Sequence, residues 1–96
     1  MTAAQLTKQA LEYLNANGHF VVRINNIPGQ KYRKGNVTKG VADIMGCTKD
    51  GRALAIEIKT TDRQSVFQKC FEEHYKKRSG IYILCKSLND IIRAGL

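Results

Sequence analysis

The chain has no tryptophan, a single proline and only three cysteines. No apolar run approaches the ~18 residues of a membrane-spanning helix, and the N-terminus lacks the apolar core of a signal peptide, so we expect a protein that is not exported. The cysteines, Cys47, Cys70 and Cys85, form no Cys-x-x-Cys pair, which argues against a zinc knuckle and against a disulfide framework. We expect all three to be buried, reduced thiols, as in a cytosolic protein.

Acidic residues are also scarce. Eight Asp and Glu stand against 16 Lys and Arg, which gives a formal net charge of +8 in 96 residues. This charge favours a polyanionic partner such as nucleic acid, and the lack of a basic amphipathic helix disfavours a membrane surface. With 43% apolar and 25% charged residues, the chain looks globular. Residues 1–96 are therefore expected to form a single domain with one sheet covered by a few helices.

Local patterns predict the element order α-β-β-β-α-β-α, in which a meander and a helical crossover to a fourth strand give a mixed α/β sheet. Capping boxes begin at Thr2 and Ser65, and turn formers such as Lys49-Asp50-Gly51 separate the β-rich runs. The predicted elements are a helix over 3–17, strands over 19–24, 40–47 and 52–59, a helix over 65–78, a strand over 81–85, covered on both faces, and a short helix over Leu88, Ile91 and Ile92.

The second helix is expected to bury an apolar stripe made of Val66, Phe67, Cys70, Phe71 and His74. A packed His74 and an isolated His19 argue against a histidine-based nuclease. The run Lys76-Lys77-Arg78 falls in the last turn, where its positive charges interact favourably with the helix dipole. Direct contact of this run with DNA stays open as an alternative.

Residues 25–39 combine turn formers with basic side chains. Two interpretations stay open for so long a loop. It is either a solvated connection or a flexible flap that binds phosphates, with an aromatic ring able to stack on a base. The residues concerned are Lys31, Tyr32, Arg33, Lys34 and Lys39.

The chemistry is concentrated in Asp43, Glu57 and Lys59. Because strand side chains alternate, Glu57 and Lys59 share one face of their strand with two alanines, while Leu54, Ile56 and Ile58 point the other way. Two carboxylates can hold Mg²⁺, and a lysine beside them can orient a water. An Asp is disfavoured within a strand, so a metal, a turn or a surface partner must compensate for Asp43. In a basic chain the combination suggests metal-dependent cutting of a phosphodiester.

With Asp43 on the second strand and Glu57-x-Lys59 on the third, the chain resembles the PD-(D/E)xK nuclease superfamily. Within it, the chain is most similar to the virus-type replication-repair nuclease (VRR-NUC) domain, which occurs in phage proteins and at the C-terminus of the Fanconi-associated nuclease. The resemblance implies a restriction-endonuclease-like α-β-β-β-α-β core. The matching segments are Lys39-Gly40-Val41-Ala42-Asp43-Ile44, Ala55-Ile56-Glu57-Ile58-Lys59, Ser65-Val66-Phe67-Gln68 and Ser87-Leu88-Asn89-Asp90.

The resemblance also implies roles. Asp43, Glu57 and the backbone carbonyl of Ile58 would bind Mg²⁺ or Mn²⁺, and Lys59 would hold the attacking water and stabilise charge on the phosphate. Gln68 would approach the site from the start of the second helix, although its capping box alone also explains it.

The family often places an acid on the first helix. The only one here is Glu12, a tentative further ligand, which a helical wheel places opposite the stripe Leu6, Ala10 and Leu14. Without Glu12 a second metal position would be doubtful.

We therefore expect a structure-selective DNA endonuclease of phage or prophage type, acting in the bacterial cytoplasm. A small stand-alone domain suits a homodimer, and two sites related by a twofold suit a Holliday junction. The alternative is a basic nucleic-acid-binding module without catalysis; a restriction enzyme of the same superfamily also stays open. Phosphate and base contacts are expected from Lys31, Tyr32, Arg33, Lys34, Lys39 and Arg63.

Overall fold

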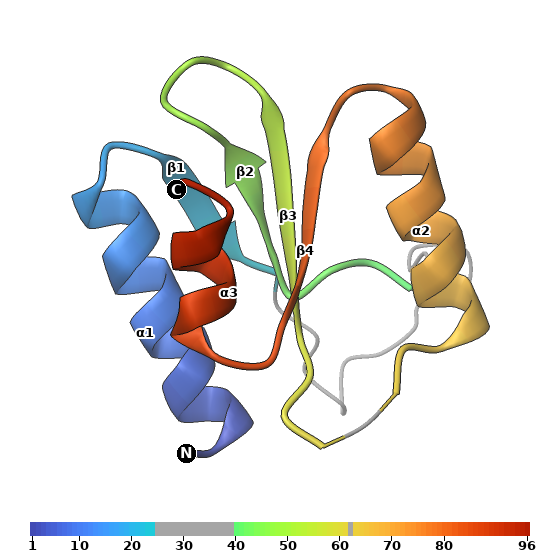
Figure 1. The fold of residues 1–96 in the computed structure, drawn as a ribbon, viewed down its shortest axis with the longest axis horizontal. Helices are drawn as coiled ribbons and strands as arrows, with labels where there is room; N and C mark the ends of the chain where they lie inside the picture. The colour runs from blue at the N-terminus through green and yellow to red at the C-terminus, as the bar shows by residue number, and fades with distance from the viewer. Residues whose placement is uncertain (25–39, 62) are drawn as a thin grey trace.

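The computed structural model has an α/β fold in which helices cover both faces of a four-stranded sheet (Figure 1). It describes residues 1–24, 40–61 and 63–96. The strand order is β1-β2-β3-β4, with β1–β2 and β2–β3 antiparallel and β3–β4 parallel. The predicted class, mixed sheet and short C-terminal helix are confirmed. The elements are α1 (Ala3–Ala16), β1 (Phe20–Arg23), β2 (Ile44–Cys47), β3 (Ala53–Ile58), α2 (Val66–Lys77), β4 (Ile81–Cys85) and α3 (Leu88–Arg93).

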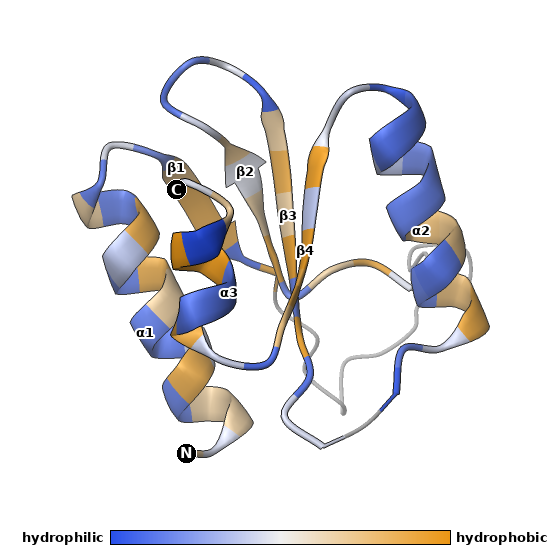
Figure 2. Ribbon diagram, in the orientation of Figure 1, coloured by the Kyte–Doolittle hydropathy of each residue, from blue (hydrophilic) through white to orange (hydrophobic). Residues whose placement is uncertain are grey.

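Strand β3 runs through the centre of the sheet and separates two apolar clusters. Leu54, Ile56 and Ile58 belong to the larger cluster, beneath α1 and α3. Ala55 belongs to the smaller cluster, beneath α2. The predicted alternation of faces is therefore confirmed, and Figure 2 shows the hydrophobic colouring that runs along β3 and β4 between the two helical layers.

Helix α2 covers its face of the sheet only in part. Phe71 and Tyr75 pack over Ala42, Ala55 and Tyr82, and the small alanines let the helix approach. No residue of α2 is buried, so the predicted stripe is wrong in most of its members. Four of its five residues are exposed, namely Val66, Phe67, Cys70 and His74.

Both predicted capping boxes are present. Thr2 and Gln5 exchange hydrogen bonds at the start of α1, and Ser65 and Gln68 do the same at the start of α2. Helix α1 ends next to Gly18, whose φ of +91° suits glycine. Within the described ranges, no helix has the length and apolarity needed to cross a bilayer.

Strand β2 begins at Ile44 rather than at residue 40. Gly40 has a φ of +86° and turns the chain against the backbone of α2. Asp43 therefore precedes the strand instead of lying inside it. Its backbone still pairs with the segments on both sides, because its carbonyl accepts from Ile24 N–H and its N–H donates to Ile56 O. Asp is more favourable at a turn position next to a strand than in the interior of a strand.

The prediction of three buried cysteines holds only for Cys85. Cys47 is half-buried and Cys70 is exposed. Cys70 differs because α2 turns Gln68, Phe71 and Tyr75 toward the sheet instead. No disulfide is formed by any of the three.

Strand β1 is an edge of the sheet, and a side chain of α1 covers part of that edge. Asn15 Nδ2 donates to Val21 O, and Asn15 Oδ1 accepts from Val21 N–H, at 3.2 Å each. One amide therefore satisfies both backbone groups of Val21, as a neighbouring strand would.

Candidate metal centre

The acids predicted from the sequence meet where β2 begins and β3 ends. Ile44 of β2 pairs with Ile56 of β3 in antiparallel register. Asp43, just before β2, therefore lies opposite Glu57 of β3. Asp43 Oδ2 accepts a hydrogen bond of 2.8 Å from Ile58 N–H. The charge of Asp43 reaches Glu57 strongly enough to raise its pKa. The two acids therefore lie together rather than on opposite faces of the sheet.

Glu57 is a buried carboxyl with one oxygen bonded and one not. The residue is 2% exposed. Its Oε2 accepts a 2.7 Å hydrogen bond from Gln68 Nε2, while its Oε1 is buried with no hydrogen-bond partner among the described residues. Buried polar atoms are almost always satisfied, so this oxygen needs either a proton shared with Asp43 or a bound cation.

The surroundings of Glu57 disfavour its charged form. Burial, followed by the negative charge of Asp43, raises its pKa to about 8, against a smaller lowering by Lys59. At pH 7 Glu57 is therefore mainly protonated in the metal-free protein. A cation bound between the two acids would reverse the balance, because it removes their mutual repulsion and binds the ionised form.

Lys59 directs its ammonium to the same place. Its Nζ lies 4.0 Å from Glu57 Oε2, and its side chain is only 16% exposed. The backbone fixes this position, since Lys59 N–H donates to Cys85 O and continues the parallel pairing of β3 with β4. The amine therefore stands beside the carboxylate pair and not in open solvent.

Gln68 joins the site to the helix cap. Its Oε1 accepts from Ser65 N–H at 2.8 Å, while its Nε2 donates to Glu57. The two interpretations of Gln68 are thus compatible. Gly40 brings this turn close: a Cβ there would lie 2.3 Å from Phe67 O and 2.9 Å from Gln68 N, so no side chain fits between the two segments.

A polar network that the sequence did not predict adjoins the site. Gln64 Nε2 donates to Tyr82 OH at 3.1 Å and to Glu72 Oε1 at 3.0 Å. Glu72 in turn pairs with Lys76 at 2.6 Å, which helps to lower its pKa. Burial raises the pKa of Tyr82 to about 12, with a smaller contribution from Glu57. No sequence spacing connects Gln64 with Tyr82, because the contact depends on how α2 lies over β4.

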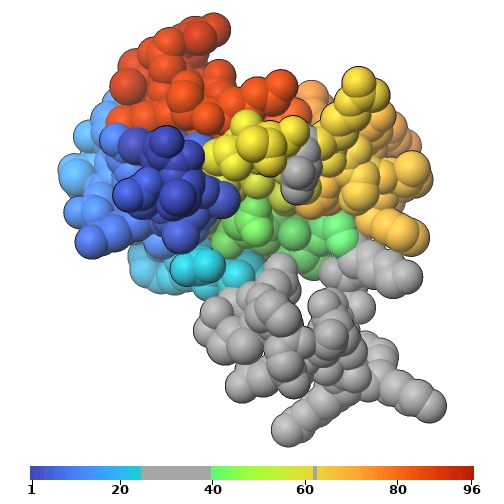
Figure 3. All heavy atoms as spheres, turned by 90° about the horizontal axis from the view of Figure 1, so that it is seen from below, coloured from blue at the N-terminus to red at the C-terminus, as the bar shows by residue number. Residues whose placement is uncertain are grey.

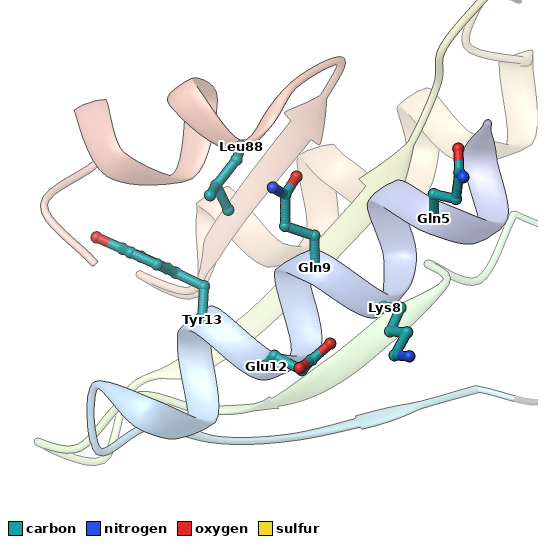
Figure 4. A pocket seen from close by; sticks show the side chains of 6 residues that line it. All are labelled: Gln5, Lys8, Gln9, Glu12, Tyr13 and Leu88. Atoms are coloured by element: carbon teal, nitrogen blue, oxygen red, sulfur yellow. The ribbon is translucent and has the colours of Figure 1, made fainter. Parts of the chain in front are cut away.

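Some predicted site residues are not brought to this group. Glu12 is exposed on α1, which packs on the opposite face of the sheet. It lines a surface pocket with Gln5, Lys8, Gln9, Tyr13 and Leu88 (Figure 4). Arg63 is exposed, in the connection between β3 and α2. Five predicted DNA contacts lie outside the described residues, namely Lys31, Tyr32, Arg33, Lys34 and Lys39.

The residues present fit one hard cation. Across the three described ranges, no group of three or more His, Cys, Asp or Glu side chains is placed to hold a metal. Mg²⁺ does not need such a group, because it commonly binds one or two carboxylates and keeps several waters. The unpaired Oε1 of Glu57, together with the carboxylate of neighbouring Asp43, would supply oxygen ligands of this kind. Comparison with family models, with curated proteins and with solved structures yields no match.

Proposed function

We propose that this chain is a Mg²⁺- or Mn²⁺-dependent endonuclease that hydrolyses phosphodiester bonds in branched DNA, with the four-way junction as the leading substrate. The observation that carries the proposal is the unpaired, buried Glu57 Oε1 next to Asp43, with Lys59 Nζ 4.0 Å from the other oxygen of Glu57. A surface Glu-Lys pair would not be buried with an unsatisfied oxygen.

Asp43, Glu57 and the backbone carbonyl of Ile58 would hold the ion. When bound, a divalent cation polarises a phosphate oxygen and lowers the pKa of a nearby water. Glu12 has no part in this site, because it lies on the other face of the sheet. A single ion is therefore proposed.

The protein's own residues would position the reaction. Lys59 would hold the attacking water through its ammonium and offset negative charge that grows on the phosphate. Gln68 would keep Glu57 oriented by occupying Oε2 and leaving Oε1 for the cation. The water oxygen bonds to phosphorus and gives up a proton to solvent, the bond to the leaving oxygen breaks on the opposite side, and the leaving oxygen takes up a proton from solvent.

The charge of the chain supports DNA as the substrate. A net charge of +8 supplies phosphate contacts that are independent of sequence, so binding should weaken steeply with salt. We include Lys31, Arg33, Lys34, Lys39 and Arg63 among these phosphate contacts, and Tyr32 would stack on a base. A twofold dimer would present two such sites to the two symmetric strands of a junction. The proposed setting is the cytoplasm of a bacterial host, which suits three unpaired cysteines.

The deciding experiment offers purified protein a four-way junction, a flap, a splayed arm and a plain duplex, with Mg²⁺ and with EDTA. We expect metal-dependent cutting that is strongest on the junction. Equal cutting of all four DNAs would end the claim of structure selectivity. Salt-sensitive binding to every DNA without any cutting would instead establish the non-catalytic nucleic-acid-binding module, which the net charge alone favours.

A further inference from the structure

Tyr82 carries a buried hydroxyl on the same face of the sheet as the candidate metal centre. The residue lies in β4 and is 8% exposed. Its register partner in β3 is Ala55, two residues before Glu57, so Tyr82 and Glu57 share one face of neighbouring parallel strands. Tyr82 also shares an apolar cluster with Ala42, the residue directly before Asp43. The two segments that carry the acids therefore both extend from the cluster that contains Tyr82.

The hydroxyl of Tyr82 reaches the end of the molecule at which β3 ends. It accepts a hydrogen bond of 3.1 Å from Nε2 of Gln64, in the connection between β3 and α2. Figure 3 looks onto this end. The segment that begins at Gly40 (green) lies there beside the end of β3 and the connection to α2 (yellow), as the bond between Asp43 and Ile58 requires. The hydroxyl is thus directed to the end of the sheet where the acids meet.

This hydroxyl accepts a hydrogen bond but has no acceptor for its own hydrogen. Gln64 Nε2 donates one hydrogen to Tyr82 OH and its other hydrogen to Glu72 Oε1, at 3.0 Å. Among the residues that the structure describes, none accepts the hydrogen of the Tyr82 hydroxyl. Because a buried tyrosine hydroxyl usually finds a partner, a group outside the described protein atoms is needed to receive this hydrogen.

The charges around the hydroxyl place it near both acids. Burial is the main cause that raises the pKa of Tyr82 to about 12, and the charges of Glu57, Glu72 and Asp43 add to it. The hydroxyl therefore keeps its hydrogen at neutral pH. Since neither Glu57 nor Asp43 accepts that hydrogen directly, a bridging water is the simplest group to stand between the hydroxyl and the acids.

A hard cation brings such waters with it, because Mg²⁺ held by one or two carboxylates keeps several of them. We propose that Tyr82 donates its hydroxyl hydrogen to a water of the cation held by Asp43 and Glu57, and that Gln64 orients the hydroxyl for this contact. Tyr82 is then a positioning residue for the ion and not one of its ligands. This inference rests on the cation of the proposed function, but it needs neither DNA nor cleavage.

A purely structural role of the hydroxyl makes a different prediction. If Tyr82 only held Gln64 in place, loss of the hydroxyl would lower the melting temperature and leave the metal affinity of the folded protein unchanged. If the hydroxyl contacts a water of the ion, the affinity itself falls. Loss of a group behind a metal ligand commonly weakens metal binding about ten- to a hundredfold.

The test titrates Mg²⁺ into DNA-free protein by calorimetry at pH 8.5, where more of Glu57 is ionised than at pH 7. Tyr82→Phe removes one oxygen and keeps the ring, whose centroid lies 6.1 Å from that of Phe71. We expect it to weaken Mg²⁺ binding about tenfold. Gln64→Leu keeps the hydroxyl but removes the donor that orients it, and should weaken binding to a smaller extent. Circular dichroism melts verify that each variant is folded at the temperature of the titration.

Tyr75→Phe is the matched control. Tyr75 stacks on Phe71 beside the same cluster. Burial alone raises its pKa, with no contribution from an acid, so its hydroxyl does not face the metal centre. The control should bind Mg²⁺ as the wild-type protein does. Unchanged affinity in Tyr82→Phe, or an equal loss in Tyr75→Phe, would overturn the inference.

A second measurement decides the question even if Tyr82→Phe does not fold. Because the chain has no tryptophan and four tyrosines, its near-ultraviolet absorbance reports on tyrosine. Mg²⁺ should change the tyrosine difference spectrum of the wild-type protein with the same midpoint as the binding heat. Tyr75→Phe should keep that change, and a folded Tyr82→Phe should lose it. Binding heat without any spectral change in the wild-type protein would also overturn the inference.

Cutting assays separate this inference from the proposed function. If wild-type protein binds Mg²⁺ in a way that depends on Tyr82 but cuts no DNA, the endonuclease proposal fails and the role of Tyr82 stands. If wild-type protein cuts DNA with Mg²⁺ while Tyr82→Phe binds the ion with wild-type affinity, the role of Tyr82 fails and the endonuclease proposal stands. Absence of Mg²⁺ binding by the wild-type protein would overturn both.

Discussion

Gln68 Nε2 donates a 2.7 Å hydrogen bond to Glu57 Oε2, while Oε1 of the same amide accepts from Ser65 N–H at 2.8 Å. A helix cap and a candidate ligand therefore share one side chain. Because one end of the amide is held by the cap, the other end cannot turn away from Glu57. This arrangement directs the bonded oxygen of Glu57 toward α2 and leaves the second oxygen as a ligand for the proposed cation.

Cap and site can be separated by mutation at Gln68 and Ser65. Ser65→Ala should cost about 1 kcal/mol of stability through the lost cap and leave metal affinity unchanged. Gln68→Ala should cost a similar amount and also weaken Mg²⁺ or Mn²⁺ binding by about tenfold, the usual effect of removing a partner of a metal ligand. Thermal melts and calorimetric metal titrations measure the two effects. Equal metal affinity in both variants would contradict the bridging role.

The stability of the metal-free protein should fall with rising pH because of Glu57. Its pKa rises from the ordinary value of 4.5 to about 8 in the fold, so the folded state binds the proton more tightly than the unfolded chain does. The resulting stability is fully present below pH ~4.5 and is lost as pH rises through about 8, a loss on the order of a few kcal/mol. Glu57→Gln should flatten this slope in melts recorded in EDTA.

Metal should act in the opposite direction. Because the cation binds ionised Glu57, Mg²⁺ should raise the melting temperature more at pH 8.5 than at pH 6. Glu57→Gln should abolish that rise, while Glu12→Gln should retain it, since Glu12 is exposed on the far face of the sheet. A loss of the metal effect in Glu12→Gln would show that the two acids act together after all.

Lys59→Ala separates cutting from binding. We expect junction cutting to fall by at least about a hundredfold, because one charged group at a developing anion commonly contributes that much. Binding in EDTA should fall only slightly, since a single phosphate contact among many is lost. Lys8→Ala, an exposed lysine on α1, is the control and should change neither quantity. Undiminished cutting by Lys59→Ala would exclude the proposed mechanism.

Gly40 and Gly51 provide a matched pair for the close contact with α2. Both have positive φ, +86° and +92°, but a Cβ at Gly51 meets nothing within 4 Å, whereas one at Gly40 would lie 2.3 Å from Phe67 O. Gly51→Ala should cost about 1–2 kcal/mol for its backbone conformation. Gly40→Ala should cost about 1–3 kcal/mol more and should weaken metal binding by moving Gln68. Equal melting temperatures would rule out the steric contact.

The strands and the acid pair were predictable because they depend on local pattern. Alternation along β3 places Glu57 opposite Ile56 and Ile58, and the antiparallel hairpin then brings Asp43 to it. The start of β2 was not predictable. It depends on Gly40 and on the side chain of Asp43. Asp43 Oδ2 accepts the hydrogen bond of Ile58 N–H, which a backbone carbonyl would accept in a regular strand pair.

The inward face of α2 was misjudged for a related reason. The prediction took the most apolar stripe as the buried one. The face that lies over the sheet instead combines Phe71 and Tyr75 with polar Gln68 and Glu72, and the polar pair is accommodated by Glu57 and Gln64. A helix beside a charged site can turn polar residues inward, and a hydrophobic pattern alone does not reveal the tertiary partners that stabilise them.

The pairing of Asn15 with Val21 limits how copies of this chain can assemble. An open strand edge attracts further strands from other molecules. On β1 the N–H and C=O of Val21 already bond to the amide of Asn15. This four-residue strand therefore has fewer backbone groups available for pairing with a further strand. A dimer that merged two sheets through β1 into one continuous sheet is therefore disfavoured, and two copies would have to associate through another surface, such as the other sheet edge at β4.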